Sequence, residues 1–238
     1  MSLPSLETGS PRWKILNRVT DVILTHQLPH PTRVAVDGID AAGKSIFGDE
    51  LAASISSRGI PVIRSSIDHF HYPRQQRHQR YGSDSPLGYY EDSFNYPQVR
   101  TVLLDPLGPG GNRVHRTAAF DFETDSVVES AVETAPENAI LVFDGIFLMR
   151  KELLDCWDIK IYLDIPFEVS VQRASQRQRD QNLFGEVDQV AGRYWKRYVP
   201  GQKIYFEQCQ PKEHADIVIG NRDLNNPQII YMRFGENR

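Results

Sequence analysis

Short apolar runs alternate along the chain with segments in which apolar side chains recur at helical spacing. The helical spacing predicts helices over residues 12–25, 44–58, 96–104, 166–182 and 186–198. The apolar runs predict strands over residues 33–37, 61–67, 139–143, 159–163 and 217–219. Strands that alternate with helices favour a parallel sheet covered on both faces, so we expect a doubly wound α/β fold.

The alternation is interrupted between the second and third predicted strands. The segment LDPLGPGG at 104–111 is a cluster of turn residues, and residues 112–122 suggest a hairpin or an extended arm. We therefore expect a small antiparallel excursion near residues 108–125. The chain as a whole divides into an N-terminal extension and helix, one main domain and a C-terminal tail, over residues 1–30, 31–222 and 223–238.

The length and composition are those of an ordinary globular protein. The 238 residues suit one large domain, and the 40% hydrophobic and 24% charged residues are average values. A net charge of -4 does not favour nucleic acid or an anionic membrane as a partner. Cys156 and Cys209 lack CxxC spacing and are expected to be reduced thiols. No segment reads as a signal peptide or a membrane span, so we expect a cytoplasmic location.

A phosphate-binding motif follows the strand predicted at 33–37. Residues 38–45, GIDAAGKS, match G-x-x-x-x-G-K-[ST], which must follow a strand and open a helix. Its backbone N–H groups point at phosphate oxygens, and the helix adds its positive end. Lys44 offers a cation to the β and γ phosphates of ATP, and Ser45 offers a hydroxyl to Mg²⁺. The predicted nucleotide-binding residues are Gly38, Asp40, Ala41, Ala42, Gly43, Lys44, Ser45 and Ile46.

Three carboxylates come directly after apolar runs, where ligands of an open parallel sheet bind. Asp144 has the form of a Walker B carboxylate that helps to hold Mg²⁺. Asp68 ends the second strand, where it would act as the general base for an acceptor hydroxyl and assist Ser45 and Asp144 with the metal. Asp164 precedes Ile165-Pro166 and is interpreted as a cap of the next helix.

Arginines late in the helix predicted at 166–182 suggest a lid. Arg173 and Arg177 are four residues apart and would share a helix face, and Arg179 and Asp180 follow. Arginines stabilise the charge that spreads over a phosphoryl group in transfer, and a mobile lid excludes water. An earlier run, Arg74, Arg77 and Arg80, faces either an anionic acceptor or solvent.

Seven segments, in order between about Arg33 and Asn221, carry a family resemblance. They are VAVDGIDAAGKS, SSIDHFHYP, GYYEDSFNYP, AFDFETDS, ILVFDGIFL, RASQRQRD and YVPGQKIYFEQCQPKEHADIVIGN. In this order they resemble the uridine kinase family of P-loop kinases, which is related to phosphoribulokinase and bacterial pantothenate kinase. The resemblance implies ATP and Mg²⁺ as cofactors and a nucleoside or sugar hydroxyl as the acceptor. Members of this family often self-associate, so a homo-oligomer is also expected.

The resemblance also assigns roles to residues. It implies Asp68 as the catalytic carboxylate of a D-x-F segment, with Lys44 and Arg177 as the other catalytic residues. The remaining positions are predicted to contact the substrates: Tyr90, Asn95, Phe120, Phe122, Asp125, Arg173, Arg177 and Arg179.

Two of these positions depart from the family pattern. Uridine kinases have a base-recognising histidine where this chain has Asp125, and Asp-His-Pro where it has Asn95-Tyr96-Pro97. A site built to hydrogen-bond one ligand edge rejects ligands that lack it by up to roughly 10⁵-fold, so such exchanges change the acceptor more readily than the chemistry. The resemblance therefore implies a kinase, with uridine only as the default acceptor and a different hydroxyl acceptor, pantothenate and glycerate included, as an alternative.

Three other readings remain open. The loop GIDAAGKS is very like that of thymidylate kinases, but the Asp-Arg pair of nucleoside monophosphate kinases is missing after Asp68 and Asp144. A GTPase needs Asn-Lys-x-Asp, and Asn221-Arg222-Asp223-Leu224 has its carboxylate one place early. A nonenzymatic nucleotide-binding module would be expected to lose a carboxylate, the lysine or the lid, all of which are present.

Overall fold

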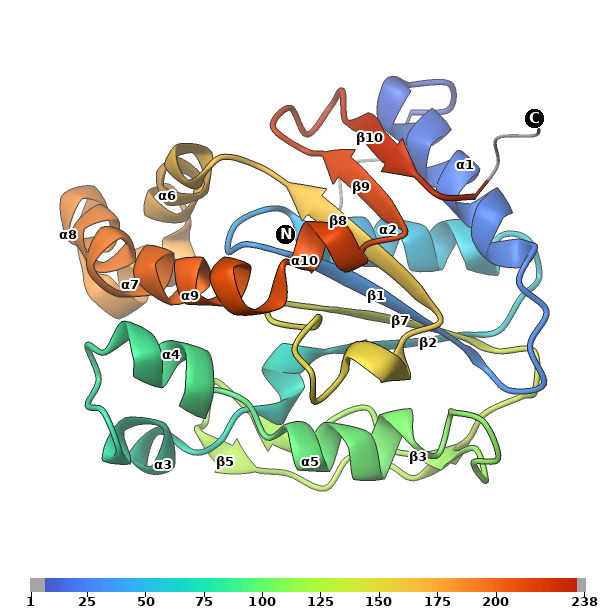
Figure 1. The fold of residues 1–238 in the computed structure, drawn as a ribbon, viewed down its shortest axis with the longest axis horizontal. Helices are drawn as coiled ribbons and strands as arrows, with labels where there is room; N and C mark the ends of the chain where they lie inside the picture. The colour runs from blue at the N-terminus through green and yellow to red at the C-terminus, as the bar shows by residue number, and fades with distance from the viewer. Residues whose placement is uncertain (1–6, 235–238) are drawn as a thin grey trace.

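The computed structural model of the chain describes residues 7–234, which form a mixed α/β fold around a six-stranded sheet (Figure 1). The strand order is β10-β9-β8-β1-β7-β2. Five strands are parallel, and β10 is antiparallel to β9. Their bounds are β1 Thr32–Gly38, β2 Val62–Ser66, β7 Ile140–Gly145, β8 Ile159–Asp164, β9 Ile217–Gly220 and β10 Gln228–Met232.

Helices cover both faces of this sheet, which confirms the predicted doubly wound fold. Side chains alternate along the central strands, so that Val34 and Val36 face one core and Ala35 faces the other. The first core is closed by α1 (Pro11–Leu24) and α2 (Lys44–Ser56), as Figure 1 shows. The second lies under the helices α4 (Pro86–Asp92) and α5 (Tyr96–Val99) and the short helical segments η1 (Ile67–Phe70), η2 (Arg100–Leu104) and η3 (Leu154–Cys156). The helix α3 (Arg74–Gln79) has no buried residue and lies outside this core.

The antiparallel excursion consists of two separate strand pairs beside the second core. In one, β3 (Val114–His115) pairs with β6 (Glu133–Thr134). In the other, β4 (Phe120–Asp121) pairs with β5 (Ser126–Val127). Because β6 is the partner of β3, the excursion reaches residue 134, beyond the predicted end at 125.

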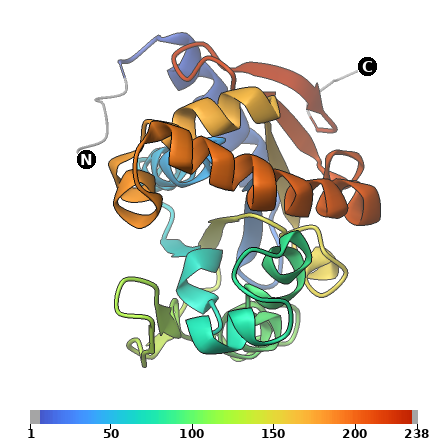
Figure 2. The same cartoon turned by 90° about the vertical axis from the view of Figure 1, so that its left-hand side faces the viewer.

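The helices α6 to α9 gather where the parallel strands end, at the left of Figure 1 and facing the viewer in Figure 2, while α10 lies beside β8. The predicted helix 166–182 is two helices, because Gln176 ends the first and Arg177 has extended backbone. The predicted helix 186–198 instead runs on to residue 209, since a π-helical turn accommodates the break in hydrogen bonding at Pro200. These segments are α6 Phe167–Ser175, α7 Gln178–Phe184, α8 Val187–Arg193, η4 Tyr194–Tyr198, α9 Val199–Cys209 and α10 Pro211–His214.

Both chain ends contribute to the main body. Arg12 of α1 is buried and contacts Glu50 of α2 at 2.6 Å. Near the other end, β10 adds an edge strand within residues 223–238, where the sequence pattern predicted only a tail. The division at residues 30/31 and 222/223 therefore remains a prediction.

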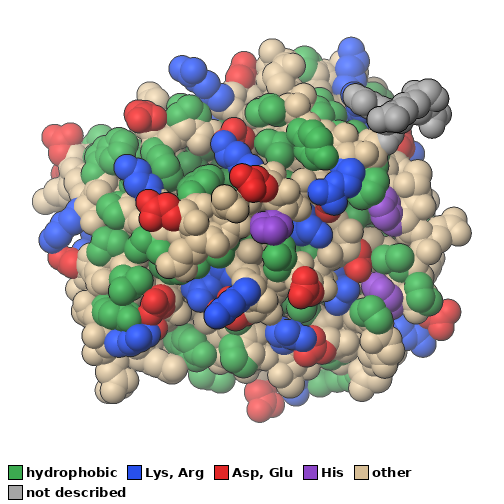
Figure 3. Space-filling view, in the orientation of Figure 1, with side chains coloured by type: hydrophobic (Ala, Val, Ile, Leu, Met, Phe, Trp, Pro, Cys, Tyr) green, Lys and Arg blue, Asp and Glu red, His purple; other side chains and the backbone are tan. Residues whose placement is uncertain are grey.

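Charged side chains of both signs are interspersed over the face in Figure 3. None of the helices within residues 7–234 is long and apolar enough to cross a membrane. Cys156 is buried, Cys209 is partly buried, and both are free thiols.

A fully buried carboxylate connects β1 to α9. Asp37 accepts a hydrogen bond from the Tyr205 hydroxyl and another from the Gly38 N–H at 2.7 Å, while Tyr205 accepts one from the Met149 N–H. Burial raises the pKa of Asp37 from 3.8 to about 6, although the hydrogen bonds and Lys44 oppose the shift.

This shift predicts how stability depends on pH. Between about pH 4 and 6 the folded chain keeps a proton on Asp37 that the unfolded chain has released, so the free energy of unfolding falls as pH rises. The full shift of about 2 pKa units corresponds to about 3 kcal/mol. Urea titrations of the native chain and of Asp37→Asn would give the free energy of unfolding at each pH. Between about pH 4 and 6 the two curves of free energy against pH should diverge by about 3 kcal/mol. Asp21→Asn, which removes an exposed carboxylate, should follow the native curve. If the native and Asp37→Asn curves run parallel, the raised pKa of Asp37 is contradicted.

Candidate active site

The phosphate loop lies between β1 and α2, in a conformation that depends on two glycines. Gly43 has φ +91°, a left-handed value that glycine adopts without strain. Gly38 passes so close to β8 that a Cβ there would lie 2.7 Å from the Leu163 carbonyl oxygen. Lys44 begins α2, and its ammonium donates to the Ile39 carbonyl at 2.9 Å, which places it over the loop.

Side chains from α4, α9, α6 and the end of β9 fix this loop. The Tyr89 hydroxyl donates to the Asp40 carboxylate at 2.8 Å, and the Gln202 side chain bonds both this carboxylate and the Asp40 N–H. Ser170 donates to the Asp40 carbonyl at 2.7 Å, and the buried Asn221 amide donates to the Ala42 carbonyl at 2.7 Å. The loop is therefore held from the second core, from α6 and from the end of β9.

A hydroxyl and a carboxylate meet next to the loop. Ser45 Oγ donates to Asp144 Oδ2 at 2.8 Å, and Asp144 is 2% exposed. Arg64 of β2 lies on the other carboxylate oxygen, with Nη2 2.7 Å from Oδ1. Gly48 leaves room for this guanidinium, because a Cβ there would lie 2.9 Å from Nη2.

This oxygen pair suits Mg²⁺, which prefers hard ligands and uses one or two carboxylates together with substrate phosphates. No group of three or more His, Cys, Asp and Glu side chains is arranged for a metal within residues 7–234. A Mg²⁺ at Ser45 and Asp144 would therefore take its other ligands from water and the nucleotide.

Asp68 lies in the same cavity as Lys44, Ser45 and Asp144. His71 Nδ1 is 3.0 Å from the Ser93 carbonyl, which points Nε2 toward Asp68 Oδ1 at 3.6 Å. Arg179 approaches Asp68 Oδ2 at 3.8 Å. Burial opposes the ionised form, but His71, Arg179 and Lys44 together hold the pKa of Asp68 well below its ordinary value. Asp68 is therefore ionised at neutral pH.

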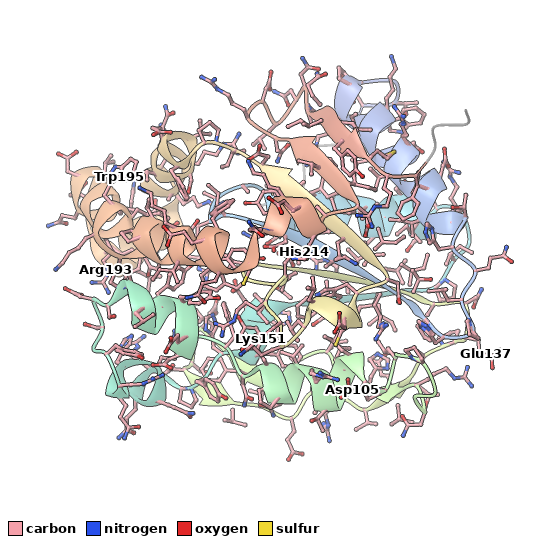
Figure 4. All side chains as sticks on the ribbon, viewed as in Figure 1. Asp105, Glu137, Lys151, Arg193, Trp195 and His214 are labelled. Carbon is pink, nitrogen blue, oxygen red and sulfur yellow. The ribbon has the colours of Figure 1, made fainter. Side chains whose placement is uncertain are left out.

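The lid segment, residues 177–198, contains α7, α8 and η4, and its side chains Arg177, Arg179 and Arg197 line the cavity. Figure 4 shows Arg193 and Trp195 at the outer end of this lid. The expectation that Arg173 and Arg177 share a helix face is wrong, because the helix ends between them. Arg173 instead braces the phosphate loop, donating to the carbonyls of Ala41 at 3.3 Å and Asn221 at 2.9 Å.

Sequence and fold comparisons agree with this geometry. No protein-family model matches the chain. Uridine kinase from Staphylococcus aureus strain JH9 is 22% identical over 84% of this chain and 93% of its own length. A solved structure from Bacillus stearothermophilus, described as a possible uridine kinase, has a TM-score of 0.67 at 21% identity and covers 86% of this chain and 97% of its own. D-glycerate 3-kinase from Cryptococcus neoformans has a TM-score of 0.56 at 12% identity, over 91% and 99%.

The chain is therefore similar to uridine kinases in sequence and resembles uridine kinase-like P-loop kinases in fold. The structure gathers most of the predicted nucleotide-binding residues around one cavity. Gly38 and Ala42 are buried beneath the loop and do not line it. The predicted residues that do line it are Asp40, Ala41, Gly43, Lys44, Ser45, Ile46, Asp68, Phe122, Asp144, Arg177 and Arg179.

Five of the eight predicted acceptor contacts, Arg173 among them, do not line this cavity in the structure, and their roles toward the acceptor stay predictions. Asn95 caps α5, accepting from the Gln98 N–H at 3.1 Å, and does not line the cavity. Tyr90 lines a second cavity with Arg150 and Cys209, on the face where Figure 4 labels Lys151 and His214. Phe120 is buried behind the lining.

Asp125 is also set back from the cavity. It does not line the cavity but accepts from the Arg74 N–H at 3.0 Å and from Arg77 Nη2 at 3.1 Å. Asp125 thereby orients Arg77, which does line the cavity and lies 5.2 Å from the Phe122 ring centroid.

Sequence reasoning missed Arg64, His71, Tyr89 and Arg197. The first two are close in sequence to Asp68, which is the only signal that the chain offers for them. Tyr89 stands one residue before the predicted Tyr90, and helix direction decides which ring faces the loop. For Arg197, the segment RYWKRYVPG shows several basic and aromatic residues without distinguishing the buried one.

The Arg64–Asp144 contact predicts a stability effect. Arg64→Met leaves a buried carboxylate with only Ser45 as a partner, so the free energy of unfolding should fall by about 2–3 kcal/mol in metal-free urea titrations. Asp49→Asn removes the other, more exposed partner of the same guanidinium and should cost less than about 1 kcal/mol. Mg²⁺ should restore stability to Arg64→Met more than to the native chain. Equal losses in the two variants would contradict a special role for the Asp144 contact.

Proposed function

We propose that this protein is a kinase that transfers the γ-phosphate of ATP to a hydroxyl group of a small-molecule acceptor of the nucleoside or sugar class. The observation that supports it most is the presence, in one cavity, of Lys44, Ser45 and Asp144 on the donor side and the ionised Asp68 opposite. The printed names of the relatives, uridine kinase and D-glycerate 3-kinase, support small hydroxyl-bearing acceptors.

On the donor side, the loop N–H groups and Lys44 bind the phosphates of ATP and hold them in line with the acceptor. Ser45 and Asp144 would hold Mg²⁺, which neutralises charge on the β and γ phosphates when bound. Arg64 keeps the Asp144 carboxylate fixed between two polar partners. The carboxylate therefore needs little reorganisation when the nucleotide binds.

On the acceptor side, Asp68 accepts a hydrogen bond from the reacting hydroxyl. As the acceptor oxygen bonds to the γ-phosphorus, the bond from that phosphorus to the bridging oxygen breaks, and ADP leaves with the electron pair. The hydroxyl proton moves to Asp68. Because the pKa of this carboxylate is low, it takes the proton late, when the oxygen has become acidic through its bond to phosphorus.

The lid completes the site. Arg177 and Arg179 face the cavity from α7 and its first turn, where they stabilise the transferring phosphoryl group. Arg179 also contacts Asp68, so the lid joins the donor and acceptor sides. Closure excludes water, which would otherwise accept the phosphoryl group.

Asp68→Asn tests the chemical assignment. The variant keeps the shape but not the proton acceptor, so kcat should fall by about 10²- to 10⁴-fold while the affinity for a nonhydrolysable ATP analogue stays within about threefold. Turnover would be measured as ADP release with nucleosides, sugars, pantothenate and glycerate.

Asp164→Asn is the matched control, because Asp164 also ends a parallel strand but pairs with Lys212 outside the cavity. It should retain native turnover. Full activity in Asp68→Asn would remove the base assignment, and tight ATP binding without turnover of any hydroxyl acceptor would indicate a nucleotide-binding module.

A further inference from the structure

Arg197 is a buried guanidinium that lacks a carboxylate partner among residues 7–234. It is 7% exposed, its Nε atom has no hydrogen-bond partner, and no described Asp or Glu oxygen lies within 4.0 Å of it. Its side chain lines the active-site cavity. Burying an unpaired charge costs free energy. A buried guanidinium without a partner in the protein therefore indicates that a ligand supplies the negative charge.

Aromatic rings compensate this charge only in part. The guanidinium carbon lies 5.2 Å from the Tyr89 ring centroid and 5.0 Å from that of Tyr198. Such contacts fix the plane and direction of the guanidinium but do not neutralise its charge.

The four carboxylates of the cavity are engaged elsewhere. Asp40 is bonded by Tyr89 and Gln202, Asp68 lies against His71 and Arg179, Asp144 binds Ser45 and Arg64, and Asp180 accepts from Tyr194. The protein therefore supplies no counter-charge to Arg197 from within the cavity.

Arg77 lies on the same side of the cavity. Its side chain is 12% exposed, and its Nε is buried without a hydrogen-bond partner, although Asp125 holds Nη2. Burial lowers the pKa of Arg77, and the positive charges of Arg74 and Arg197 contribute to the lowering. Burial likewise lowers the pKa of His78, with Arg197 and Arg77 as the next contributions. Arg197 and Arg77 therefore place two guanidinium groups on the lining of one cavity, which also holds Asp68.

We propose that the acceptor carries an anionic group, a phosphate or a carboxylate, which Arg197 and Arg77 bind while Asp68 receives the hydroxyl. This inference rests on the proposed kinase function and specifies the class of its acceptor. The planar forks of two guanidinium groups match the oxygens of such an anion, and Asp125 and the Tyr89 and Tyr198 rings hold them in place.

The test compares matched acceptors that differ by an anion: ribose with ribose 5-phosphate, glycerol with glycerate, and uridine with uridine 5′-monophosphate. We expect the native chain to prefer an anionic member by at least about 100-fold in kcat/KM. Arg197→Gln should reduce that preference by about 10- to 100-fold, mainly through the acceptor KM, with the KM of ATP within about twofold. Lys196→Gln removes the neighbouring charge, which pairs with Asp84 and does not line the cavity, and should behave like the native chain.

A second measurement separates this inference from the function on which it rests. The same compounds are added with a nonhydrolysable ATP analogue and Mg²⁺, and the thermal unfolding midpoint is recorded. Midpoints raised by anionic compounds in the native chain and in Lys196→Gln, but not in Arg197→Gln, would support the anion site even without turnover, in which case the kinase function fails alone. Turnover that favours the neutral compound of every pair, or an Arg197→Gln variant that raises the KM of ATP instead, would overturn the anionic acceptor and leave the kinase function standing. Neither turnover nor a midpoint change with any compound would overturn both.

Discussion

The parallel pairing of β1 with β7 is the constraint on which the active site depends. Its register sets Val36 opposite Asp144 and Asp37 opposite Gly145, so both strands deliver their last residues to one edge. The phosphate loop leaves β1 at that edge, and Ser45 returns in the first turn of α2 to bond Asp144. Pairing of backbones fixes these positions more firmly than side-chain contacts would, because a register shift would break every ladder hydrogen bond at once.

The donor half of the site could be predicted from the sequence because its requirements are local. A strand, a glycine-containing loop and a helix start occur in consecutive residues, and Asp144 follows an unbroken apolar run. The helical break at Gln176 was not predictable in this way, since residues on both sides keep good helical propensity. Tertiary contacts decide it: Arg173 is drawn to the carbonyls of Ala41 and Asn221, while Arg177 turns with α7 toward the cavity.

Side chains that act through distant partners could not be predicted, on the donor side or on the acceptor side. Arg64 in the segment VIRSS resembles an ordinary polar position of an edge strand, and its contact with Asp144 requires the missing Cβ of Gly48 on another element. The family pattern alone predicts that Asp125 contacts the acceptor in place of the histidine of uridine kinases. In the structure its backbone has φ +51°, and the turn presents its carboxylate to α3.

On the proposed function, the exchange at Asp125 would let one scaffold take acceptors of different charge. An acidic residue behind Arg77 adds no negative charge to the cavity surface, yet it immobilises a positive charge on that surface. Tyr89 likewise has two roles. Its hydroxyl holds Asp40 of the phosphate loop, and its ring face supports Arg197. One side chain therefore couples the geometry of the donor loop to the electrostatics of the acceptor side. Substitutions behind the cavity wall can alter which acceptor charge is favoured, while the backbone-built donor loop keeps its shape.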